Sequence, residues 1–115
     1  MATGSRSYFQ LGSLDDMNKN MRLIVDCMRS QLPYAISIPK HFKYYDDINR
    51  MIERRVRKRY ERTRLEAFLD IFRGFRANYF FSLLSVGFGD SGYTTEVHHD
   101  DYGVTVFFDP VARGN

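Results

Sequence analysis

The sequence contains no tryptophan, one cysteine and three prolines among its 115 residues. Because Cys27 has no second cysteine to pair with, an intrachain disulfide and an all-cysteine metal site are both excluded. A reducing compartment inside the cell, cytoplasm or nucleus, is the simplest expectation. The longest apolar run, Tyr79–Phe88, is interrupted by two serines and has about half the length of a membrane-spanning helix. The first residues also lack the apolar run of a signal peptide, so we expect no membrane partner.

Apolar and aromatic residues are plentiful, at 43% and 16% of the chain, with ten Phe and eight Tyr. This content is enough for a packed core and is too high for a disordered tail. Residues 1–12, rich in Gly, Ser and Thr, are expected to be a flexible leader. We expect a single domain over residues 13–109 and a short tail over 110–115.

The clearest element is a helix that begins after Ser13. Asp16 follows three residues later, as in a capping box with Asp in place of Glu. Apolar residues then recur at 3–4 residue spacing, which places them on one face: Leu14, Met17, Met21, Ile24 and Met28. Pro33 ends this helix near Gln31. Cys27 lies beside the apolar face and is interpreted as a small buried hydrophobic residue.

Residues 33–39, bracketed by prolines, are expected to form an extended linker or a short edge strand.

A second helical pattern begins near Lys40–Tyr44, and its apolar face changes position along the chain. Ile48, Ile52 and Val56 lie on one side, whereas the apolar residues of 65–72 lie on nearly the opposite side. Either the helix breaks at 61–64, giving helices of about 44–61 and 64–76, or one long helix contacts two partners. Both readings leave much apolar surface, so we expect a homodimer.

The last third of the chain is expected to form three strands, Tyr79–Phe88, Tyr93–His98 and Val104–Phe108. Turns are expected at residues 89–92 and 100–103, both of which contain glycine. The predicted fold class is therefore α+β, with two or three N-terminal helices packed on one face of a small C-terminal three-stranded antiparallel β-meander.

The net charge of +3 hides an uneven distribution. Residues 50–64 hold eight basic side chains against two acidic ones, whereas residues 89–109 hold five acids and no Lys or Arg. The basic residues are Arg50, Arg54, Arg55, Arg57, Lys58, Arg59, Arg62 and Arg64. Arginine makes bidentate phosphate contacts and stacks on bases, so this stretch favours nucleic-acid binding, either RNA or DNA, through the phosphate backbone. Tyr60 is a candidate for stacking on a base.

Two other functions remain open at this stage. A protein-interaction module or inhibitor would dock the basic helix on an acidic partner, or present the acidic hairpin. A metal-dependent hydrolase would need a site built on Glu96, His98 and Asp100, which are the best metal-ligand candidates in the chain. Neighbouring residues rarely make a metal site without a distant ligand, so no metal, cofactor or catalytic residue is expected. The glycine spacing of residues 87–92 resembles a dinucleotide fingerprint, but a strand pattern follows it where that fingerprint requires a helix.

Overall fold

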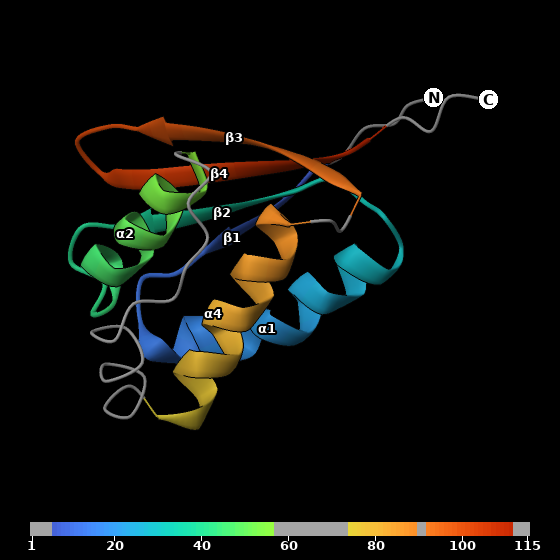
Figure 1. Ribbon diagram of the computed structural model, residues 1–115. Coiled ribbons are helices and arrows are strands. Elements are labelled where there is room, and N and C mark those ends of the chain that lie inside the picture. The colour runs from blue at the N-terminus through green and yellow to red at the C-terminus, as the bar shows by residue number, and fades with distance from the viewer. Residues whose placement is uncertain (1–5, 57–73, 90–91, 112–115) are drawn as a thin grey trace.

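The computed structural model describes residues 6–56, 74–89 and 92–111. In chain order its elements are β1 (Ser7–Gln10), α1 (Leu14–Arg29), β2 (Tyr34–Pro39), α2 (Tyr45–Val56), α4 (Phe75–Phe88), β3 (Tyr93–His99) and β4 (Gly103–Pro110). The α+β class is confirmed. The expected arrangement is wrong in detail, because the helices are interleaved with the strands along the chain and do not all precede a C-terminal meander (Figure 1).

The described strands form one mixed sheet with the order β1-β2-β4-β3. β1 pairs in parallel with β2, β2 pairs antiparallel with β4, and β4 pairs antiparallel with β3. β1 and β2 can be parallel because α1 connects them. The helix returns the chain to the end of the sheet at which β1 began, so β2 runs in the same direction. Only the β3–β4 hairpin corresponds to the predicted meander.

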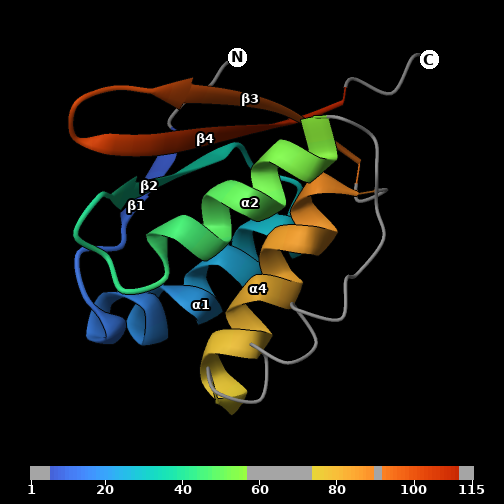
Figure 2. The same ribbon diagram turned by 60° about the vertical axis from the view of Figure 1, so that its left-hand side comes forward.

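All the described helices lie on one face of this sheet, as two views show (Figures 1 and 2). The core lies between the two layers. The sheet contributes alternate residues, among them Tyr34, Ile36, Val106 and Phe108, and the helices contribute Met17, Ile24, Ile48 and Leu84. Within the described residues, no helix is both long and apolar enough to cross a membrane.

The first helix forms as its sequence predicts. The Ser13 hydroxyl accepts a hydrogen bond from the Asp16 backbone N–H at 3.1 Å, and the Asp16 carboxylate accepts one from Gly12 at 3.0 Å. The first bond satisfies a backbone donor of the first helical turn, and the second satisfies the Gly12 N–H just before the cap. Met17, Ile24 and Cys27 are buried, and Met21 and Met28 pack against the core. The predicted apolar face is therefore confirmed except at Leu14, which is exposed.

The segment 79–88 is helical, and its prediction as a strand was wrong. It belongs to α4, which contacts α1, α2 and β3. A helix that packs against several neighbours is apolar on most sides, so its 3.6-residue periodicity disappears from the sequence. Val86 is the only β-branched residue between Phe75 and Phe88, and this scarcity favours a helix over a strand.

The N-terminal segment and residues 33–39 also differ from expectation. Within the predicted flexible leader, Ser7–Gln10 forms β1, and Phe9 and Leu11 are buried. β2 lies between β1 and β4, so it is a central strand and not a linker or an edge strand. Its prolines are tolerated because Pro33 precedes the strand and Pro39 ends it.

The glycine-rich segment after Val86 connects a helix to a strand. Gly87 and Phe88 end α4, and Gly92 precedes β3. The order is therefore helix, loop, strand, which is the reverse of what a dinucleotide fingerprint requires. Gly87 lets α4 approach the sheet, since a Cβ there would lie 2.8 Å from the Phe108 ring and 3.2 Å from the Tyr34 hydroxyl.

Candidate functional site

None of the described helices covers the second face of the sheet (Figures 1 and 2). We call it the outer face. Its residues alternate with the core residues along each strand. Strand register places Tyr8, Ala35, Phe107 and Glu96 in one row across the four strands, and Gln10, Ser37, Thr105 and His98 in the next row. Asp109 and Thr94 are paired in a third row.

Phe107 is the centre of an aromatic cluster on the outer face. The Tyr8 ring lies edge-on to it, with centroids 6.4 Å apart, and the His98 ring lies edge-on at 5.1 Å. Ala35 stands between Tyr8 and Phe107 in the register, and its small side chain lets the two rings meet. Tyr8 is 65% exposed although it is a large aromatic residue. The cluster therefore presents aromatic surface to solvent.

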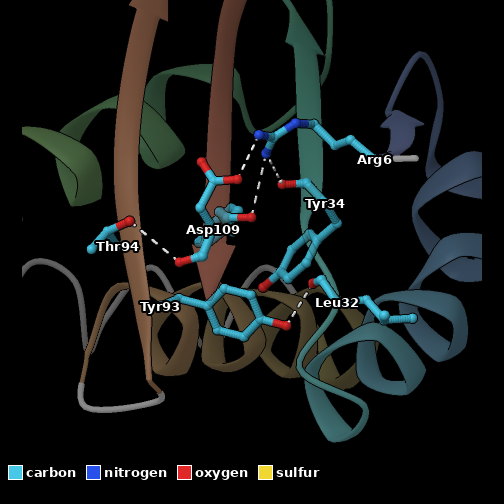
Figure 3. A network of polar contacts seen from close by, with 7 residues as sticks. Arg6, Leu32, Tyr34, Tyr93, Thr94 and Asp109 are labelled. Atoms are coloured by element: carbon cyan, nitrogen blue, oxygen red, sulfur yellow. Dashed lines mark hydrogen bonds and ion pairs between the residues drawn. The ribbon is translucent and has the colours of Figure 1, made fainter. Parts of the chain in front are cut away.

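Arg6 crosses the sheet to reach this cluster. Its guanidinium carbon lies 5.2 Å from the centroid of the Phe107 ring, a cation–π arrangement. One terminal nitrogen donates to an Asp109 carboxylate oxygen at 2.5 Å, and the other donates to the Tyr34 and Phe108 carbonyls at 3.5 and 3.4 Å. Figure 3 shows Arg6 extended over β2 toward Asp109 on β4. The guanidinium is thus held in a fixed position beside the ring.

Polar groups surround the same ring on its other sides. His98 Nε2 lies 3.2 Å from Glu96 Oε1, and both side chains are mostly exposed, at 56% and 71%. In the neighbouring row the Thr105 hydroxyl donates to the Ser37 hydroxyl at 3.2 Å. The outer face therefore combines three rings with one guanidinium, two carboxylates and a pair of hydroxyls.

The basic stretch at residues 50–64 is only partly described. Arg50 lies on α2, is partly exposed and forms an ion pair with Asp47. Arg54 and Arg55 lie on the last turn of α2, and their side chains are outside the described set. Arg57, Lys58, Arg59, Tyr60, Arg62 and Arg64 lie outside the described residues altogether. The role of this stretch in phosphate binding stays a prediction.

The three candidate metal ligands, Glu96, His98 and Asp100, do not form one set: Glu96 and His98 are in contact, and Asp100 is engaged elsewhere. In the described part of the chain, no group of three or more His, Cys, Asp or Glu side chains is arranged to hold a metal ion. Asp100 has a structural role instead, since its carboxylate accepts hydrogen bonds from the Tyr102 and Gly103 backbone at 2.9 and 3.0 Å. These bonds form the turn between β3 and β4.

Two buried tyrosines lie on the helix side of the sheet. Tyr34 stacks on Phe108. The Tyr93 hydroxyl donates to the Leu32 carbonyl at 2.7 Å (Figure 3) and to the Cys27 carbonyl at 3.0 Å. Burial raises the pKa of Tyr34 strongly, and the nearby Tyr93 and Cys27 add to this rise. Burial, and then Cys27, also raise the pKa of Tyr93. The Tyr93 hydroxyl thus ties β3 to the end of α1.

Sequence reasoning missed the outer face, although one signal was available. Phe107 and Phe108 are adjacent in a segment predicted as a strand, and neighbouring strand residues point to opposite faces. One of the two rings therefore had to leave the core. Arg6 and Tyr8 carried no comparable signal, because they lay in the segment expected to be a flexible leader.

No protein-family model, curated protein sequence or solved structure matches this chain. Its function therefore has to be inferred from the chemistry of the side chains themselves.

Proposed function

We propose that the protein binds single-stranded nucleic acid on the outer face of its sheet. The observation that carries this proposal is the Phe107 ring, which lies on the sheet face that none of the described helices covers, with the Tyr8 and His98 rings and the Arg6 guanidinium around it. Unpaired bases stack on aromatic rings and on guanidinium planes, and each stacked base contributes about 1–3 kcal/mol.

The mixture of groups favours nucleic acid over a protein partner. The core of a protein–protein interface is apolar and depleted in charged residues. Here the rings alternate with Arg6, Asp109, Glu96 and the Ser37–Thr105 hydroxyl pair, all within two or three residues of Phe107 on the sheet. Such groups suit bases, which combine a flat apolar surface with a polar edge.

A single strand fits this face better than a duplex. The bases of a duplex are stacked on one another, so a flat sheet cannot reach their faces, whereas a single strand can spread its bases. On the outer face the Arg6 guanidinium is paired with Asp109, and the Glu96 carboxylate contacts the His98 ring. Stacking therefore supplies the affinity here, and the predicted phosphate contacts of the Arg50–Arg64 stretch would add a salt-dependent contribution.

Fluorescence anisotropy with a labelled 12-nucleotide strand, and with the same strand in a duplex, tests the proposal. We expect the single strand to bind more tightly. Phe107→Leu keeps an apolar side chain and removes the flat ring, so it should weaken single-strand binding about tenfold. Tyr79→Leu on α4 is the matched control, because Tyr79 is an exposed aromatic residue on the helical side of the molecule. Its affinity should stay within twofold of the unmodified protein.

Two results would contradict the proposal. One is a Phe107→Leu variant that folds and binds the single strand as tightly as the unmodified protein. The other is the absence of binding to any nucleic acid at low salt, which would favour the protein-interaction module.

A further inference from the structure

A base that stacks on Phe107 has two carboxylates beside it. Glu96 is directly opposite Phe107 in the β3–β4 register, and Asp109 is two residues further along β4. Directly opposite residues of an antiparallel pair share a face, with Cβ atoms about 5 Å apart. A base stacked on Phe107 would therefore have its edge near one or both carboxylates.

The two carboxylates differ in how strongly they are engaged. Asp109 is bound by Arg6 at 2.5 Å and is 43% exposed, so it acts as the positioning residue for the guanidinium. Glu96 is 71% exposed, and its contact is one carboxylate oxygen, Oε1, 3.2 Å from His98 Nε2. A long, exposed side chain held at one oxygen can turn toward a ligand. Glu96 is therefore the group that meets the base edge.

An ionised carboxylate accepts hydrogen bonds at both oxygens and donates none. Guanine is the one common base with two adjacent donors, N1–H and the N2 amino group, on its Watson–Crick edge. Adenine and cytosine each place an acceptor nitrogen next to their amino group, and uracil or thymine has one N–H between two carbonyls. Each of these turns an acceptor toward the second carboxylate oxygen, which disfavours a bidentate contact.

We propose that the outer face selects a guanine within a single strand, with Phe107 stacking on the base and Glu96 accepting from its N1–H and N2 amino group. This inference rests on the proposed function. It goes further by naming the preferred base and the residue that reads it.

The test uses four labelled 9-nucleotide strands of thymidine whose central base is guanine, hypoxanthine, adenine or thymine. Hypoxanthine lacks the N2 amino group and otherwise keeps the guanine edge. We expect the guanine strand to bind about tenfold more tightly than the adenine and thymine strands, and the hypoxanthine strand to fall between them. Because this comparison changes only the ligand, it does not depend on how any variant folds.

Glu96→Gln provides the matching change in the protein. A carboxamide offers one acceptor and one donor, which suits the adenine edge, so the preference should move from guanine toward adenine. Binding of the all-thymidine strand should stay within twofold. Asp101→Asn is the control, because it removes a negative charge from an exposed position in the turn after β3. It should leave all four affinities in their original order.

The outcomes separate the two proposals. Tight but equal binding of all four strands would overturn the guanine preference and leave single-strand binding intact. A guanine preference that Glu96→Gln does not change would overturn the role of Glu96. No binding of any strand would overturn both the guanine preference and the proposed function.

Discussion

Arg6 and Asp109 form an ion pair between residues 103 positions apart in the sequence, with a nitrogen–oxygen distance of 2.5 Å. The pair joins the residue just before β1 to the end of β4, across the intervening strand β2. It also fixes the Arg6 guanidinium 5.2 Å from the centroid of the Phe107 ring. One ion pair therefore connects the start of the first strand to the end of the last strand in the chain, and it shapes the outer face.

The Arg6–Asp109 pair should stabilise the fold modestly. Arg6 is 24% exposed and Asp109 is 43% exposed, so solvent screens part of their attraction. We expect Arg6→Met and Asp109→Asn each to lower the free energy of unfolding by about 1 kcal/mol, with the double variant losing less than the sum. Urea denaturation of the four proteins measures this. Strictly additive losses would show that the two side chains do not interact.

Removing Asp109 should also alter binding, because Arg6 would lose its anchor beside Phe107. Asp109→Asn should weaken single-strand binding a few-fold, and Asp109→Glu, which keeps the charge, should restore most of it. Anisotropy with the 12-nucleotide strand measures both variants. Equal binding by Asp109→Asn and the unmodified protein would mean that Arg6 does not need this contact.

Alkaline pH should unfold the protein through Tyr34. The ordinary tyrosine pKa is 10.0, and burial raises the pKa of Tyr34 in the folded chain well above it. Above pH 10 the unfolded chain therefore loses a proton that the folded chain keeps, and stability falls by about 1.4 kcal/mol for each further pH unit. Below pH 10 this contribution is fully present. Denaturation at pH 8 to 11 should show a smaller loss for Tyr34→Phe, and equal losses would contradict the role of Tyr34.

Gly103 should tolerate no side chain. A Cβ at this position would overlap the Ile38 carbonyl oxygen and lie 2.9 Å from the Pro39 Cα, so the β2–β4 pair would have to separate. Gly103→Ala should lower the free energy of unfolding by about 3 kcal/mol. Gly74→Ala is the comparison, because its φ of 87° alone should cost about 1 kcal/mol. Thermal denaturation ranks the two variants, and the opposite order would contradict this account of β2–β4 packing.

The basic stretch gives a prediction that is independent of the outer face. If Arg54, Arg57 and Lys58 contact phosphates, changing all three to Gln should reduce the slope of log K against log salt by about two units for a single strand. Phosphate contacts carry no direct sequence information, so the guanine preference should persist. An unchanged slope would remove this stretch from the interface.

Some of this structure was determined by local sequence alone. The Ser13 cap and the 3–4 spacing of apolar residues after it specify α1. Both signals lie within the residues of the helix itself, so they can be read from the local sequence. The β3–β4 hairpin follows from two alternating segments around a turn that Asp100 and Gly103 build. The buried Cys27 followed from its place beside the apolar face of α1.

The rest was decided by tertiary packing. α4 packs against neighbours on several sides, so apolar residues occur around most of its surface. Its sequence therefore lacks the 3.6-residue apolar periodicity that would have predicted a helix. β1 exists because β2 offers it a parallel partner, and its four residues carry too little pattern to predict a strand alone. On the outer face Arg6 contacts Asp109 and Tyr8 contacts Phe107, which are about 100 positions later in the sequence. A pattern among neighbouring residues cannot predict such a contact. Local propensity and periodicity are properties of neighbouring residues, whereas strand order and the sites built on it depend on long-range pairing.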